Sequence, residues 1–121
     1  MLSDSKQPIY IQIINDLKKQ MASGKLCPGD KLLPVRDMAL NYKVNPNTIQ
    51  RSYQELERDG IITVQRGVGS FVTDDDSAIK EMKYQLGRIA LEHFFDEMSS
   101  IGYNVKEIVY MVNEEGGKLN A

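Results

Sequence analysis

Cysteine and histidine are almost absent from this 121-residue sequence, which has one of each, Cys27 and His93. A single cysteine cannot form a disulfide within the chain, and this suits a reducing compartment. The two residues leave little material for a zinc site or for a cysteine–histidine nucleophile pair. No paired carboxylates and no nucleophile with a base partner can be assembled either. We therefore expect no enzymatic activity, no bound metal and no cofactor.

Long apolar runs are also missing. The longest runs contain only a few residues, which excludes a membrane-spanning helix of about 20 apolar residues. The N-terminal stretch MLSDSKQPIY has no basic segment followed by an apolar one, so it does not resemble a secretory signal. Apolar residues make up 41% and charged residues 26% of the chain, as in soluble globular proteins. We expect a cytoplasmic protein with no membrane partner.

A strong excess of charge of one sign is absent as well, since the net charge is −2. The charge is unevenly distributed: residues 1–75 carry ten Lys or Arg and nine Asp or Glu, whereas residues 76–121 carry five and eight. This asymmetry fits a near-neutral recognition module followed by an acidic appendage.

What the sequence does contain is a clear order of elements. Apolar residues at helical spacing predict three helices, a pair of short apolar runs around a glycine-rich turn predicts a β-hairpin, and two more helices follow. The expected helices span residues 8–23, 35–42, 46–59, 77–100 and 105–112, the hairpin spans 62–72, and residues 114–121 are expected to fray.

The third predicted helix has the clearest boundaries. Asn45 is a suitable N-cap and Pro46 a suitable first-turn residue. Ile49, Tyr53 and Leu56 recur at intervals of four and three, so they should face the core. Three helices followed by a hairpin is the order of a winged helix-turn-helix, which makes the fold class mainly α with a small β-hairpin.

The residues at the start of this helix suit contact with DNA. A major groove admits one α-helix, whose N-terminal residues reach base edges, and amide, hydroxyl and guanidinium groups can bind bases or phosphates. Arg36 can contact the backbone, and a cation beside glycines in the hairpin turn can enter a minor groove. The candidate DNA-binding residues are Arg36, Asn45, Asn47, Thr48, Gln50, Arg51, Arg66, Gly67 and Gly69.

Each of these residues also has a purely structural interpretation. Asn and Thr at a helix start commonly act as caps, and glycines can simply serve a turn. Arg66 can be a solvated loop residue, and Arg51 and Arg58 can pair with glutamates on the exposed face of the helix. The ordered combination of the candidates, more than any one of them, favours the functional interpretation.

Residues 8–75 resemble the DNA-binding domain of the GntR family of bacterial transcription regulators. The stretches that carry the resemblance are PIYIQIINDLKKQMASGKLCPGDKLLPVRDMA and VNPNTIQRSYQELERDGIITVQRGVGSFV. The resemblance implies that six residues occupy the family's DNA-contacting positions: Arg36, Asn47, Thr48, Gln50, Arg66 and Gly67. Two departures stand out: Pro46 and Gln50 replace an arginine found in some members, and LLPVR lacks the usual serine before the second helix.

The C-terminal segment, residues 77–121, is too short to enclose a ligand pocket. It is similar to the short YtrA-like branch of the family, in which two C-terminal helices form a dimer interface. The apolar stripe agrees, because a two-helix tail can bury it against the same tail of a second chain. Packing onto its own domain is the alternative. The residues expected at the interface are Leu86, Ile89, Phe94, Phe95 and Met98.

Together these observations predict a homodimeric, sequence-specific transcriptional regulator, most simply a repressor, that binds a palindromic double-stranded DNA operator. The other interpretation is a winged-helix protein–protein interaction module that has lost DNA binding, suggested by the acidic net charge and the missing arginines. The sequence does not disclose the operator, the regulated genes or any small-molecule effector.

Overall fold

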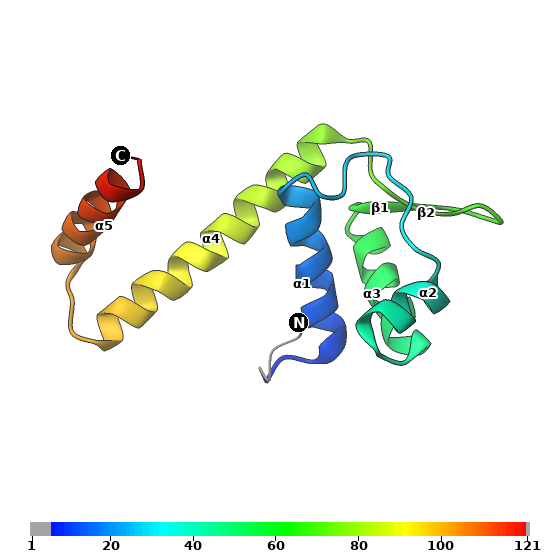
Figure 1. Ribbon diagram of the computed structural model, residues 1–121, viewed down its shortest axis with the longest axis horizontal. Coiled ribbons are helices and arrows are strands. Elements are labelled where there is room, and N and C mark those ends of the chain that lie inside the picture. Colours follow the sequence, from blue (N-terminus) through cyan, green and yellow to red (C-terminus); the bar gives the residue numbers. More distant parts are fainter. Residues whose placement is uncertain (1–5, 121) are drawn as a thin grey trace. The chain divides into compact units, whose positions relative to one another are not determined.

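Helix α1 (Ile9–Ala22) begins directly after Pro8 in the computed structural model, which describes residues 6–120 (Figure 1). Its buried side chains recur at helical spacing and give one apolar face: Ile13, Ile14, Leu17 and Met21. Gly24 follows at φ +86°, a conformation that glycine adopts at little cost and that ends the helix. The helix predicted over residues 8–23 is confirmed.

The helix-turn-helix pair consists of α2 (Val35–Tyr42) and α3 (Pro46–Arg58). Pro34 precedes α2, and no side chain caps the start of this helix. This agrees with the sequence, which lacks the usual capping serine before α2. Lys43 ends α2 in the left-handed conformation at φ 58°, which turns the chain sharply toward α3. Both helices confirm the predicted spans.

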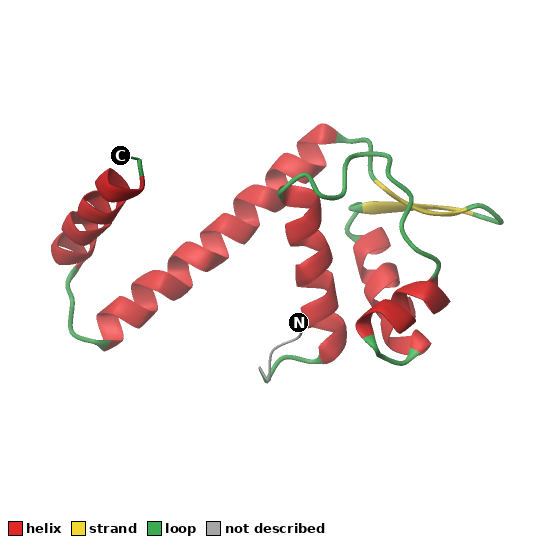
Figure 2. Ribbon diagram, in the orientation of Figure 1, coloured by secondary structure: helices red, strands yellow, loops and turns green. Residues whose placement is uncertain are grey.

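Strands β1 (Ile62–Gln65) and β2 (Gly69–Val72) pair antiparallel, with Ile62 opposite Val72 and Gln65 opposite Gly69 (Figure 2). The connector between α1 and α2 runs along β2, because the N–H of Leu32 donates to the carbonyl of Ser70 at 2.8 Å. This bond, together with those from Gly29 to Val72 and from Val72 to Asp30, fixes the hairpin against the rest of the domain.

A single apolar cluster joins the helices and the hairpin. Its fully buried members come from several elements and include Ile13, Leu17, Ile49, Leu56 and Ile62. The inward face predicted for α3 is confirmed, since Ile49, Tyr53 and Leu56 are 0%, 5% and 0% exposed. The opposite face of α3 therefore lies toward solvent.

Helix α4 (Asp76–Ser100) follows the hairpin, and its first turns belong to the same cluster through Ile79 and Met82. The chain divides into two compact units, one that ends at Tyr84 and one that begins at Gln85. The expected DNA-binding segment, residues 8–75, thus shares its core with the start of α4.

Helix α5 (Val105–Leu119) begins with a reciprocal cap. Asn104 accepts from the N–H of Glu107 at 2.9 Å, and the Glu107 side chain accepts from the N–H of Asn104 at 3.0 Å. The expectation that residues 114–121 fray was wrong as far as Leu119, because the helix continues through them. An ion pair from Lys118 to Glu115 lies within this last part.

Within residues 6–120, no helix is both long enough and apolar enough to cross a membrane.

Candidate nucleic-acid interface

The start of α3 is held by its own first residues. The Asn45 side chain accepts a hydrogen bond of 2.8 Å from the N–H of Asn47. The predicted cap is therefore confirmed, and it uses the side-chain oxygen of Asn45. The amide nitrogen of that side chain takes no part in the cap, so capping and a contact to DNA are compatible.

The exposed face of α3 forms a shallow groove of about 410 Å³. Its lining residues follow helical spacing and are mostly amides and cations, which can donate to base edges and to phosphates. They are Asn47, Gln50, Arg51, Gln54, Glu55 and Arg58. Gln54 is not among the candidates predicted from the sequence, although its spacing of four from Gln50 places it on the same face.

Arg58 is already engaged at the C-terminal end of this face. It forms an ion pair with Glu55 and lies 3.7 Å from the Asp59 carboxylate. The structural interpretation of Arg58 as a partner of a neighbouring glutamate is confirmed. The acidic partners lower the positive charge at this end, so the N-terminal half of α3 is the part better suited to a polyanion.

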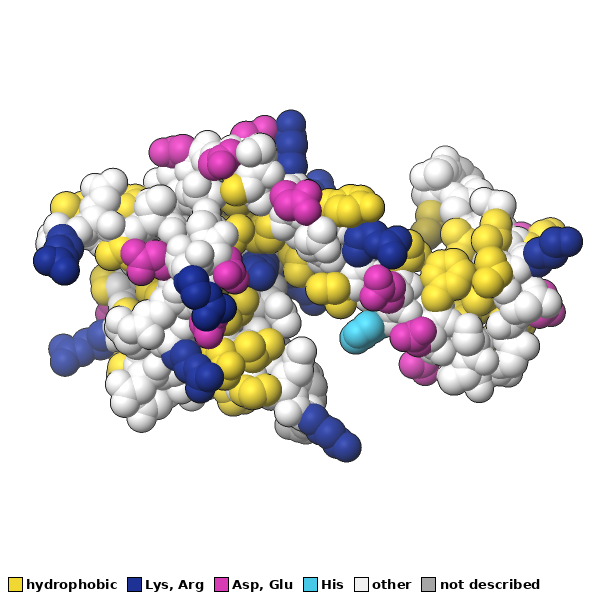
Figure 3. All heavy atoms as spheres, turned by 180° about the vertical axis from the view of Figure 1, so that it is seen from behind, with side chains coloured by type: hydrophobic (Ala, Val, Ile, Leu, Met, Phe, Trp, Pro, Cys, Tyr) yellow, Lys and Arg dark blue, Asp and Glu magenta, His cyan; other side chains and the backbone are white. Residues whose placement is uncertain are grey.

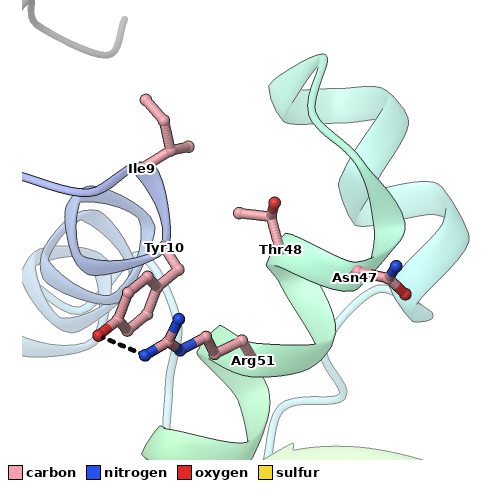
Figure 4. Close-up of a pocket in the computed structure, with 5 residues that line it drawn as sticks. All are labelled: Ile9, Tyr10, Asn47, Thr48 and Arg51. Atoms are coloured by element: carbon pink, nitrogen blue, oxygen red, sulfur yellow. Dashed lines mark hydrogen bonds between the residues drawn. The ribbon is translucent and has the colours of Figure 1, made fainter.

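Arg51 has a different partner from the one that the sequence suggested. Its guanidinium carbon lies 3.8 Å from the centre of the Tyr10 ring, and its Nη2 donates to the Tyr10 hydroxyl at 3.1 Å. Figure 4 shows the Arg51 side chain bent toward Tyr10. Ile9, Tyr10, Asn47, Thr48 and Arg51 line a pocket of about 320 Å³.

Tyr10 was missed because it belongs to another element. It lies 41 positions before Arg51, and nothing in the local pattern of α1 distinguishes it from a partly buried aromatic residue. The contact arises only because α1 and α3 pack side by side.

The hairpin turn supplies a second exposed cation. Gly67 adopts φ +75° and the N–H of Val68 donates to the carbonyl of Gln65 at 2.9 Å, which closes the turn at Arg66. Arg66 is exposed, and the turn projects beyond α2 and α3 in Figure 1. Gly69, at φ +150°, leaves room for Lys31, whose Cε would lie 2.7 Å from an added Cβ.

The two remaining candidates, Arg36 and Thr48, lie in the predicted helices. Arg36 is exposed in the first turn of α2, and Thr48 is half-buried in the first turn of α3. The contacts that any of these residues make with DNA stay predictions.

On the C-terminal helices, the expected interface residues are incompletely covered within the single chain. Ile89 and Phe94 are 54% and 38% exposed, while Leu86, Phe95 and Met98 are half-buried. The Phe94 and Phe95 rings meet edge to face at 5.8 Å. Figure 3 shows hydrophobic side chains at the surface of these helices.

Two tyrosines of the domain have strongly shifted pKa values, and both shifts follow from burial. Burial raises the pKa of Tyr53, and burial together with a hydrogen bond to Asp16 raises the pKa of Tyr42. These residues belong to the core and not to the exposed face. Among the described residues, no three His, Cys, Asp or Glu side chains are grouped so that they can hold a metal ion.

Three packed helices, a hairpin wing and an exposed polar face on the third helix define a winged helix-turn-helix domain of the kind that transcriptional regulators carry. The sequence profile described as "Bacterial regulatory proteins, gntR family" matches residues 9–72. The chain belongs to the GntR family and is a transcriptional regulator with a DNA-binding domain.

Relatives agree over nearly the full length. The HTH-type transcriptional regulator YhcF of Bacillus subtilis is 42% identical, with 93% of this chain and 95% of that protein covered. The HTH-type transcriptional repressor YtrA of the same organism is 35% identical, with 96% and 94% covered. The resemblance to the short YtrA-like branch is thereby confirmed.

Solved structures agree too. A GntR family transcriptional regulator from Listeria monocytogenes is 38% identical, with a TM-score of 0.84 over 93% of this chain and 98% of that one. The DNA-binding domain of AraR, solved in complex with an operator, is 25% identical, with a TM-score of 0.55 over 60% of this chain and 87% of that one.

Proposed function

We propose that this regulator acts as a homodimeric repressor that binds a palindromic DNA operator. The observation that carries the proposal is the start of α3, where Asn47 and Gln50 are exposed opposite the buried face of the same helix and Thr48 is half-buried beside them. In the proposed complex, α3 enters the major groove, and amides at these positions can pair with adenine while the Thr48 methyl or hydroxyl contacts thymine or phosphate.

The flanking contacts follow from the same placement. Arg66 at the tip of the wing reaches toward the minor groove, and Arg36 at the start of α2 contacts a phosphate. The glycines of the turn, Gly67 and Gly69, let the wing backbone approach DNA closely. The solved AraR complex with an operator supports DNA as the ligand, since that domain shares this fold.

A second copy of the chain is the proposed partner of the C-terminal helices. Ile89, Phe94 and Val109 are between about one third and just over one half exposed, so the single chain leaves a broad apolar surface in water. A second chain related by a two-fold axis would cover this apolar surface with its own. The dimer would then present two α3 helices to half-sites about one helical turn apart.

Repression is the proposed outcome because a dimer bound across a promoter blocks polymerase sterically. The relative YtrA is named a transcriptional repressor, which supports the same direction for this chain. No effector domain is needed for this mechanism, and no catalytic residue takes part in it.

Selection of bound duplexes from a random pool, followed by gel-shift titration of the selected site, tests the proposal. We expect a palindromic site whose affinity falls at least about tenfold for Thr48→Ala and for Arg66→Ala. Arg88→Ala is the matched control, because Arg88 pairs with Glu92 on α4, outside the proposed DNA surface. Equal binding by all variants would overturn the residue assignment, and no enrichment of any duplex would favour an interaction module instead.

A further inference from the structure

The first turn of α1 is joined to α3 at two successive residues of α3. Arg51 stacks on the Tyr10 ring and donates to its hydroxyl, while Ser52 Oγ donates to the Tyr10 backbone carbonyl at 2.9 Å. Ser52 is fully buried, so this backbone contact is shielded from water. The Tyr10 ring is therefore held at a fixed place beside the exposed face of α3.

We propose that Tyr10 is a positioning residue that holds the Arg51 guanidinium ready for a phosphate of the DNA backbone. The inference rests on the proposed function and names a residue outside the predicted site. A stacked guanidinium keeps its charge, and the bond to Tyr10 uses only one of its five N–H donors. The remaining donors can form the paired bonds that a phosphate accepts.

The position of Arg51 favours phosphate over a base edge. Its side chain bends from the exposed face of α3, which it lines together with Asn47 and Gln50, toward Tyr10 of α1 at the flank of that face (Figure 4). A recognition helix lies along the groove floor, and residues at its flank meet the backbone that borders the groove. Thr48 lines the same pocket as Arg51 and Tyr10, so its hydroxyl can add a second donor there.

Preorganisation explains why the partner is aromatic. A free arginine side chain loses much conformational freedom when it binds a ligand, and a prior stack reduces that loss. An acidic partner would fix the side chain equally well but would neutralise the charge that the phosphate needs. Tyr10 fixes Arg51 without removing its charge.

The simpler alternative is that the pair only fastens α1 to α3. The two roles differ in one measurable way. If Tyr10 acts through Arg51, its removal must lose its effect on DNA binding once Arg51 is gone. If it only fastens helices, its removal weakens binding by the same factor in both backgrounds.

A double-mutant cycle on the selected operator tests this. We expect Arg51→Ala to weaken binding about tenfold and to lower the slope of log affinity against log salt by about one unit. Tyr10→Leu should weaken binding on the order of fivefold in the wild type and less than about twofold in Arg51→Ala. Tyr10→Phe keeps the ring but not the hydroxyl and should lie between wild type and Tyr10→Leu.

Urea unfolding of each variant shows whether it is folded under the binding conditions, and Tyr84→Leu, an exposed tyrosine on α4, is the matched control. If Tyr10→Leu fails to fold, Tyr10→Phe in both backgrounds still decides the question. Equal factors in the two backgrounds, or unchanged affinity in all Tyr10 variants, would overturn the inference. So would a change of preference at one base with an unchanged salt slope in Arg51→Ala.

These outcomes are separate from failure of the proposed function. If wild type enriches no duplex, DNA binding itself fails. If wild type binds its operator and Thr48→Ala weakens it, but the cycle shows no coupling, only the role of Tyr10 fails.

Discussion

The hydroxyl of Ser52, in the middle of α3, donates to the backbone carbonyl of Tyr10, 42 positions earlier in the chain. The same hydroxyl also lies 3.1 Å from the carbonyl of Thr48, one turn back on α3. The bond therefore connects the first turn of α1 to the helix that carries the candidate DNA-contacting residues. It fixes the angle between these two helices more tightly than apolar packing alone, because a hydrogen bond has a preferred direction.

Replacing Ser52 by alanine should lower the free energy of unfolding by about 1 kcal/mol, since the hydrogen bond from the buried Ser52 hydroxyl to the carbonyl of Tyr10 is lost. Urea denaturation measures the change. Ser99→Ala on the exposed surface of α4 is the matched control and should change stability by less than about 0.5 kcal/mol. Equal effects at the two positions would show that the inter-helix bond adds nothing to stability.

Substitutions at Asn45 should separate its cap from its proposed contact with DNA. Asn45→Ala removes both and should lower the free energy of unfolding by about 1 kcal/mol as well as the affinity for the operator. Asn45→Ser keeps a capping oxygen but loses the amide nitrogen, so we expect an unchanged urea midpoint with weaker binding. If Asn45→Ser binds the operator as tightly as wild type does, Asn45 acts only as a helix cap and does not contact DNA.

A charge in the proposed dimer interface should dissociate the dimer. Ile89→Glu places a carboxylate on a side chain that is 54% exposed in the single chain and covered in the proposed dimer. Sedimentation should show a monomer, and affinity for a duplex with two half-sites should fall at least about tenfold while a single half-site binds as before.

Ser99→Glu adds the same charge on α4 outside the proposed interface and is the control. A wild-type chain that sediments as a monomer at the concentrations used for binding would contradict the dimer directly.

The free energy of unfolding should fall at alkaline pH because Tyr42 and Tyr53 titrate differently in the folded and unfolded states. Their pKa values are raised by burial above the ordinary value of 10.0. Below about pH 10 both states keep the proton, so this contribution is fully present; above it the unfolded state ionises first, and stability is lost as the pH rises toward the folded-state pKa.

Urea unfolding between about pH 8 and about pH 11 measures this loss, which amounts to about 1.4 kcal/mol per pH unit for each tyrosine that differs. Tyr53→Phe removes one such group, together with the 2.7 Å bond from its hydroxyl to the carbonyl of Leu33. Its stability should be lower near neutral pH but should fall less steeply above pH 10. Parallel curves for wild type and variant would exclude Tyr53 as a source of the alkaline loss.

The sequence predicted the elements of this fold well because their signals are local. Asn45 followed by Pro46 marks a helix start through a cap and a fixed φ, and the spacing of Ile49, Tyr53 and Leu56 identifies the buried face. The opposite face, with Asn47 and Gln50, follows from the same periodicity. The resemblance to a known family rested on these same residues.

The prediction for the C-terminal tail failed for a reason that is also physical. Two successive glycines, Gly116 and Gly117, argue against a helix by about 1 kcal/mol each. Helix α5 nevertheless continues to Leu119, after the reciprocal cap at Asn104 and with the ion pair between Glu115 and Lys118. Intrinsic propensity is a weak guide where such contacts oppose it.

By itself, then, the sequence determined which residues are buried and which are exposed along α3, because a helical period depends only on neighbours a few positions apart. Only the tertiary structure decided that Arg51 stacks on Tyr10 and does not form an ion pair with a nearby glutamate. It also decided that Ile79 and Met82 complete the core of the first unit. Contacts of this kind join distant parts of the chain, and they depend on how whole elements pack, which no local pattern records.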